Sequence, residues 1–123
     1  MRYLMTKKFG KWAKKNKLPH QELSKSMHEV MGGTFEANLG GHLFKKRIAR
    51  TGKGKRGSFR TIICFKQNNR AVYLHGFSKK SKANISDNEL KSLKVLASIL
   101  LNMDKRELQI AISSGVLVEV NNE

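Results

Sequence analysis

Residues 37–86 read ANLGGHLFKKRIARTGKGKRGSFRTIICFKQNNRAVYLHGFSKKSKANIS. These fifty residues contain thirteen Lys and Arg and no Asp or Glu. Apolar and β-branched runs separate the charges, which is typical of strands and not of a disordered basic tail. The stretch therefore predicts a small folded platform with a positively charged surface.

Three strands are expected to form this platform, at residues 43–50, 59–67 and 71–77. The glycine-rich segment TGKGKRGS at 51–58 is predicted to be a loop, and Asn68 and Asn69 a turn. Because both connections are short, we expect neighbouring strands to form antiparallel hairpins.

The residues before the platform predict a strand and two helices. Residues 2–5 favour a short strand, and Thr6 is a suitable cap for a helix at 7–17. A second helix is expected at 19–31, ended by the glycine pair that begins at Gly32. Two short helices with a tight link form a helical hairpin, which needs a sheet to pack against.

The residues after the platform are less basic and predict further helices. Ser86 and Glu89 form a capping-box pattern at the start of a helix at 87–102. A short helix at 104–113 and a strand-like segment at 116–120 follow. We interpret this part as support for the fold.

The chain of 123 residues is expected to be one α+β domain. Its N-terminal helical hairpin packs on an antiparallel β-sheet, and helices follow at the C-terminus. The three parts are 1–33, a strand and the helical hairpin; 37–82, the basic sheet; and 84–123, the C-terminal helices and tail.

The charge balance predicts a polyanionic partner. There are 25 basic and 9 acidic residues, which gives a formal net charge of +16. Such an excess repels itself unless it meets a polyanion, and nucleic acid is the usual one. A membrane surface is the competing partner, but the basic residues are interleaved with strand-like residues and do not follow one amphipathic helix. We therefore expect nucleic acid and no membrane.

The sequence favours a reducing, cytoplasmic location. No segment has the roughly 18 apolar residues of a membrane helix, and the N-terminus lacks a signal-peptide pattern. The one cysteine, Cys64, lies in an apolar run, where a buried small residue is a simpler interpretation than a catalytic thiol. No metal site or cofactor is expected, because no recognisable ligand set is present.

Arg60 is the most informative single residue. By alternation it shares a sheet face with Ile62 and Cys64, where an arginine needs either a carboxylate or a phosphate partner. No acid lies nearby in the sequence, so phosphate is favoured. Arg47 and Arg50 fall on opposite faces of the preceding strand, and alternation does not say which of them joins Arg60.

The remaining candidates flank this arginine. The glycine-rich segment offers backbone N–H groups together with cations, although it also fits a loop with solvated charges. Alternation places Tyr73, His75 and Phe77 on one face, as stacking groups for single-stranded RNA. His75 could act as general acid or base, or simply pack, and for Tyr73 the mid-strand position favours the core over a role in the site. The cations assigned to RNA binding from these two regions are Lys53, Lys55, Arg56, Lys80 and Lys82.

If the protein is an RNA-cleaving enzyme, it is expected to act without a metal ion. The 2′-hydroxyl of a ribose would attack the adjacent phosphate, and cations would stabilise the developing charge. Such a site needs arginine and lysine more than it needs paired carboxylates.

The runs GGHLFKKRIARTGKGKRGSFRTIICF and YLHGFSKKSKANISDNELKSLKVLA resemble the RelE-like toxins of bacterial type II toxin–antitoxin modules. Several uncommon strings match in order and spacing over nearly the whole chain, including FGKWAKK near its start. The resemblance implies a helical hairpin on a curved antiparallel sheet. It also implies an endoribonuclease that cleaves messenger RNA in the ribosomal A site, without a metal ion, and so inhibits translation.

The resemblance also assigns residues and a partner. Arg60 in GSFRT matches the family's active-site arginine, and Lys79 lies where better-known members carry a second catalytic cation. Lys46, Arg47 and Arg50 correspond to basic strand residues that hold RNA. The implied partner is a cognate antitoxin, often a helix-turn-helix DNA-binding protein.

One departure leaves the base of the reaction open. Better-known members often use a Tyr or His near the C-terminal end, whereas this chain has neither after His75. His75 or Tyr73 replaces it, or proton transfer falls to Lys79 or Lys82. The alternatives to ribosome-dependent cleavage are a non-enzymatic RNA- or ribosome-binding protein and a gyrase-targeting toxin of the related ParE branch.

Overall fold

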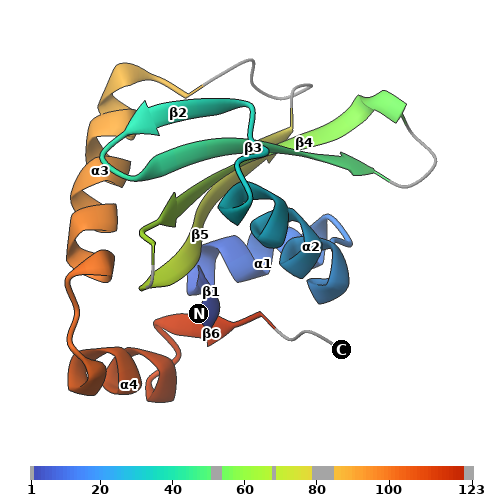
Figure 1. The fold of residues 1–123 in the computed structure, drawn as a ribbon. Coiled ribbons are helices and arrows are strands. Elements are labelled where there is room, and N and C mark those ends of the chain that lie inside the picture. The colour runs from blue at the N-terminus through green and yellow to red at the C-terminus, as the bar shows by residue number, and fades with distance from the viewer. Residues whose placement is uncertain (1, 51–53, 68, 79–84, 121–123) are drawn as a thin grey trace.

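A mixed β-sheet with helices on both faces makes up the described part of the protein (Figure 1). The computed structural model describes residues 2–50, 54–67, 69–78 and 85–120, and the side chains of 50 and 54–57 are left out of the description. The elements in chain order are β1 (Arg2–Thr6), α1 (Lys7–Lys15), α2 (His20–Met31), β2 (Ala37–Gly40), β3 (Leu43–Arg50), β4 (Gly54–Phe65), β5 (Arg70–Ser78), α3 (Asp87–Leu101), α4 (Lys105–Ser113) and β6 (Leu117–Glu119). The α+β prediction is confirmed.

The six strands of the described sheet are ordered β2-β3-β4-β5-β1-β6. The three predicted strands β3, β4 and β5 pair antiparallel, as expected. However, β1 pairs parallel with β5, so the expectation of a purely antiparallel sheet is wrong. The reason is connectivity: the two helices and the hairpin strands separate β1 from β5, and over this distance the chain can return in either direction.

Two local predictions differ from the structure. Residues 54–58 belong to β4 and not to a loop, because the hairpin arms continue to pair as far as Arg50 and Gly54. The strand β2 was not predicted, since its sequence ANLG carries little strand signal. In Figure 1 the β3–β4 hairpin extends beyond the other strands.

Helices α1 and α2 cover one face of the sheet. Thr6 caps α1 as predicted, with its Oγ1 accepting a hydrogen bond from Phe9 N at 3.1 Å. The Phe9 ring stacks on Tyr73 with 4.7 Å between centroids. The buried side chains of this layer include Leu23, Met27, Val30, Ile48, Phe59 and Ile63. We call this side the α1–α2 face.

Helices α3 and α4 cover the other side, which we call the α3 face. Its buried side chains include Leu4, Leu43, Ile62, Cys64, Val72, Leu74, Ala97, Leu100 and Leu108. The predicted capping box is present, with Ser86 Oγ accepting from Glu89 N at 3.2 Å and Glu89 Oε1 accepting from Ser86 N at 3.0 Å. This capping box fixes the residue at which α3 begins and stabilises its first turn.

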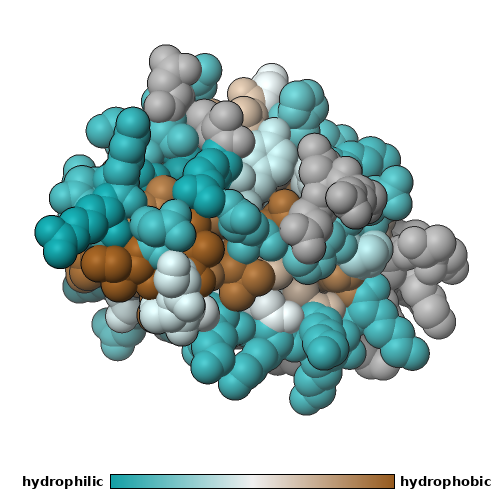
Figure 2. All heavy atoms as spheres, turned by 90° about the horizontal axis from the view of Figure 1, so that it is seen from below, coloured by the Kyte–Doolittle hydropathy of each residue, from teal (hydrophilic) through white to brown (hydrophobic). Residues whose placement is uncertain are grey.

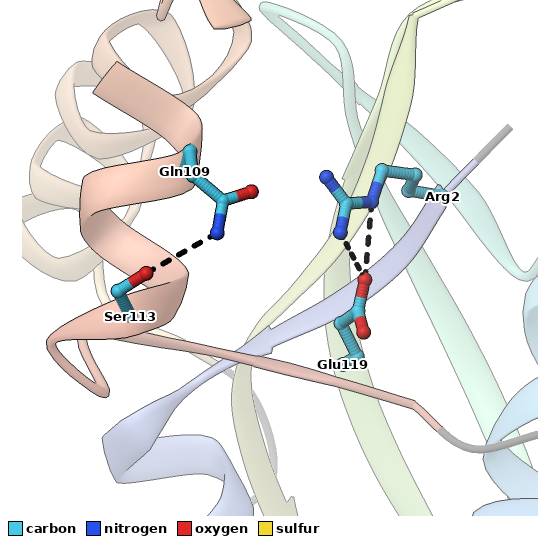
Figure 3. Close-up of polar contacts among 4 residues, drawn as sticks. All are labelled: Arg2, Gln109, Ser113 and Glu119. Carbon is cyan, nitrogen blue, oxygen red and sulfur yellow. Dashed lines mark hydrogen bonds and ion pairs between the residues drawn. The ribbon is translucent and has the colours of Figure 1, made fainter. Parts of the chain in front are cut away.

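The C-terminal elements close the edge of the sheet beside β1. Both Arg2 Nε and Arg2 Nη2 donate to Glu119 Oε1, which ties β1 to β6, and Gln109 donates to Ser113 within α4 (Figure 3). Figure 2, the view from below, shows hydrophobic atoms gathered on the side where α4 lies. Exposed apolar residues in this region are Ile110, Val116 and Val118. Among the described residues, no helix is both long enough and apolar enough to span a bilayer.

Candidate functional site

Arg60 lies on the α3 face of the sheet, because it comes two residues before Ile62 on β4. Its Cα partners are Arg47 on β3 and Phe77 on β5. Directly opposite residues on antiparallel strands carry side chains to the same face. The structure therefore places Arg47, rather than Arg50, beside Arg60.

A carboxylate holds the Arg60 guanidinium in position. Glu36 Oε1 accepts a hydrogen bond from Arg60 Nε at 3.1 Å and lies 3.2 Å from Lys45 Nζ. Glu36 is fixed in turn, because its backbone N donates to Lys45 O at 2.7 Å. The Arg60 side chain is only 12 % exposed, and its buried Nη1 has no hydrogen-bond partner among the described residues. One edge of the guanidinium is thus engaged, while Nη1 keeps its capacity to donate.

The local charge favours an anionic ligand. Lys45, Arg47 and Arg60 carry three positive charges against the one negative charge of Glu36, which leaves a net +2 among these four residues. Two like charges on directly opposite strand residues are destabilising unless an anion lies between them. The buried Ser58 hydroxyl, on the same strand, also lacks a partner in the described part of the chain. We call Lys45, Arg47, Arg60 and Glu36 the arginine cluster.

A β-bulge at Leu74 separates two residues that alternation had placed together. Tyr73 pairs with Ile63, and His75 pairs with Ile62, so Leu74 is an extra residue on β5. Tyr73 consequently points to the α1–α2 face, where it stacks on Phe9. His75 and Phe77 lie on the α3 face with 5.8 Å between their ring centroids. Of the three aromatic candidates on β5, His75 and Phe77 therefore share a face with Arg60, and Tyr73 does not.

Tyr73 is fully buried, and its hydroxyl donates to Leu23 O at 2.6 Å. Burial raises the pKa of this phenol far above its ordinary value, so it stays protonated at neutral pH. These features give Tyr73 a structural role in joining β5 to α2.

We expect Tyr73→Phe to lower the free energy of unfolding by about 1–2 kcal/mol, because one buried hydrogen bond is lost. Urea unfolding of matched samples of wild type and variant measures the difference. A free energy of unfolding equal to that of wild type would show that this hydrogen bond does not stabilise the fold.

Lys46 also lies apart from the arginine cluster. It is buried on the α1–α2 face, with its Nζ 3.2 Å from Glu29 Oε1 and donating to Thr34 O at 3.3 Å. These contacts join β3 to the end of α2. The position favours a structural role for this lysine over contact with RNA.

The other predicted cations are described only in part. Arg50 lies at the end of β3, and Lys55 and Arg56 lie in β4, where the backbone alone is described. The candidates outside the described residues are Lys53, Lys79, Lys80 and Lys82.

A cavity of about 310 Å³ adjoins His75. It lies between α1, β5 and the start of α3, and its lining residues are Lys8, His75, Asn88, Glu89, Ser92 and Leu93. The side chains include a cation, a carboxylate, an amide and a hydroxyl, which can form hydrogen bonds with a polar ligand.

Sequence reasoning missed Glu36 and Lys45. Glu36 stands one position before the acid-free stretch, so the search for a local carboxylate beside Arg60 stopped just short of it. Lys45 lies two residues before Arg47 on β3, so strand alternation places both side chains on the same face. The sequence alone could therefore have indicated Lys45. The contact of Glu36 with Arg60 depends on the antiparallel return of β2 beside β3.

Other catalytic chemistries find little support in the described residues. They contain no group of three or more His, Cys, Asp and Glu side chains that could hold a metal ion. Burial raises the pKa of the Cys64 thiol to about 12, so it is protonated at neutral pH and unsuited to nucleophilic attack.

A comparison with protein families identifies the family of this chain. A family model described as the RelE toxin of the RelE/RelB toxin–antitoxin system matches residues 1–120. The chain belongs to the RelE toxin family. A comparison with curated proteins gave no match. RelE membership makes the protein a toxin of a toxin–antitoxin system, whose partner is an antitoxin.

Proposed function

We propose that this RelE toxin is a ribosome-dependent endoribonuclease that cleaves messenger RNA in the ribosomal A site and so inhibits translation. The observation that carries the proposal is the pair of arginines on directly opposite residues of β3 and β4, with Arg60 Nη1 unsatisfied in the described structure. A phosphate between the two guanidinium groups would satisfy both charges.

The proposed reaction needs no metal ion. The 2′-hydroxyl oxygen of a ribose attacks the adjacent phosphorus, and the bond from phosphorus to the 5′-oxygen breaks. The products are a 2′,3′-cyclic phosphate and a 5′-hydroxyl end. A base accepts the proton of the 2′-hydroxyl, and an acid returns a proton to the 5′-oxygen.

Arg60 and Arg47 are proposed to stabilise the charge that develops on the phosphate oxygens. The Arg60 guanidinium is already held by Glu36, so its donors cost little reorganisation at the moment of reaction. Glu36 acts as a positioning residue through Arg60 Nε. His75 is a candidate for the acid or the base, because it lies on the same face two residues from Phe77. Lys79 remains a candidate from the sequence.

The cellular setting follows from the same proposal. Messenger RNA on the ribosome is cytoplasmic, and the proposed antitoxin is a helix-turn-helix DNA-binding protein that neutralises the basic surface. The basic residues that the sequence assigns to RNA binding, namely Arg50, Lys53, Lys55, Arg56, Lys80 and Lys82, are proposed to contact the RNA backbone.

Expression of the toxin with mapping of transcript ends tests this function. We expect growth arrest together with new 5′-hydroxyl ends inside translated codons, and no new ends in untranslated RNA. Arrest with intact transcripts would support a non-enzymatic ribosome binder instead. Arrest with accumulating DNA breaks would favour a gyrase-targeting activity.

A further inference from the structure

We propose that the cavity between α1, β5 and α3 is a nucleobase subsite that sets the sequence preference of cleavage. The inference rests on the proposed function, since it assigns the cavity to a base next to the cleaved phosphate. The cavity has a volume of about 310 Å³, which leaves room for one base with its ribose. We call it the α3 cavity.

The lining of the α3 cavity suits a base. The His75 ring and the Leu93 side chain offer flat and apolar surfaces, on which a base can stack. Asn88 and Ser92 lie one turn apart on α3 and offer both donors and acceptors. An amide of this kind forms paired hydrogen bonds with a base edge, which discriminates between bases.

Asn88 and Ser92 take no part in the capping contacts that the described residues make at the start of α3. The capping box at the start of α3 uses Ser86 and Glu89, and it leaves Asn88 out. Neither Asn88 nor Ser92 has a hydrogen bond from its side chain to another described residue. Both residues are exposed to solvent although they border a cavity. Their polar groups are therefore available to a ligand.

The position of the cavity relative to the arginine cluster supports this assignment. Arg60 lies opposite Phe77, and His75 is two residues further along β5 on the same face. From strand geometry, the Cα atoms of Arg60 and His75 are roughly 8 Å apart. A nucleotide whose phosphate lies at the arginine cluster can therefore reach the cavity with its base. Lys8, at the rim on α1, can neutralise a neighbouring phosphate.

The first test compares the cleavage sites of wild type, Asn88→Ala and Ser92→Ala on the same translated transcripts. We expect a base preference at one position beside the cut to weaken by roughly tenfold or more in a cavity variant. Cleavage at the preferred base should fall, whereas cleavage at the other bases should stay close to wild type, because the arginine cluster is intact. Ser98→Ala is the matched control, since Ser98 is exposed on α3 outside the cavity. An unchanged preference in both cavity variants would overturn the proposal.

A second test does not depend on cleavage. Binding of the purified toxin to single-stranded RNA tetramers of A, C, G or U is measured by fluorescence anisotropy. We expect wild type to distinguish the four tetramers and Asn88→Ala to bind them more equally, whereas Ser98→Ala should match wild type. Equal binding of all four by wild type would remove the base subsite. Discrimination in binding with no cleavage on ribosomes would instead remove the proposed nuclease function and leave the subsite standing.

Discussion

Arg60→Ala should lower RNA cleavage by about a hundredfold or more and abolish growth arrest. Removing one preorganised donor from a site of developing negative charge typically costs a factor of about 10²–10³ in rate. Arg60 combines such a donor with a full charge, on a side chain that Glu36 already orients. Single-turnover cleavage on ribosomes measures the rate, and growth after expression gives the biological readout.

Two further variants make this result specific. Lys66→Ala removes the same charge from an exposed residue after the other end of β4, and should change cleavage only a few fold. Arg60→Lys keeps the charge but loses the planar fork of donors, so we expect it to recover only a small part of the activity. Full activity in Arg60→Lys would mean that charge alone is required at this position.

The fold of the Arg60→Ala variant needs a separate check, because Arg60 also contacts Glu36. Glu36 keeps Lys45 as a partner at 3.2 Å, so the carboxylate is not left without a counter-charge. We therefore expect a circular dichroism spectrum and a melting temperature close to those of wild type. Growth arrest by a folded Arg60→Ala variant at equal expression would remove Arg60 from the mechanism.

Strand alternation predicted part of the site correctly. It placed Arg60 with Ile62 and Cys64, and the structure has both of these residues in the core on the α3 face. It could not choose between Arg47 and Arg50, because the choice depends on which residue of β3 lies opposite Arg60. That register is set by long-range pairing of the strands.

The bulge on β5 shows a limit of the same reasoning. One extra residue at Leu74 reverses the face of every residue on one side of it, and nothing in VYLHGF marks the position. Tyr73 packs in the core under α1, and Leu74 packs in the core under α3. The need to bury both residues arises only when the helices are packed on the sheet. The prediction that Tyr73 and His75 share a face was wrong for this reason. Helix starts were predicted better, because Thr6, Ser86 and Asp104 act within one turn of the chain.

Gly76→Ala is expected to lower the free energy of unfolding by about 1–3 kcal/mol, the usual cost of overpacking a close contact. A Cβ at Gly76 would lie 2.4 Å from two ring carbons of Trp12. The ring cannot move freely, because it packs on Phe9 and against the edge of Phe59. Since Gly76 lies between His75 and Phe77, the shift should also disturb the candidate site.

Gly10→Ala is the matched control for this change. Gly10 lies within α1, and a Cβ there would meet only Met5, at an ordinary contact distance of 3.7 Å. We expect this variant to be more stable by about 0.5–1 kcal/mol, because alanine restricts the unfolded chain and favours helix. If Gly76→Ala lowers the free energy of unfolding and Gly10→Ala raises it, then the close contact with Trp12, and not the added methyl group itself, determines the effect.

A double-mutant cycle with Trp12→Ala identifies the source of the strain. If the indole ring is what a Cβ at Gly76 meets, then Gly76→Ala should cost little in the Trp12→Ala background, and the two changes should couple by about 1–2 kcal/mol. Urea unfolding followed by circular dichroism avoids reliance on the lost tryptophan. An equal cost of Gly76→Ala in both backgrounds would mean that the backbone of β5, and not Trp12, requires a glycine at this position.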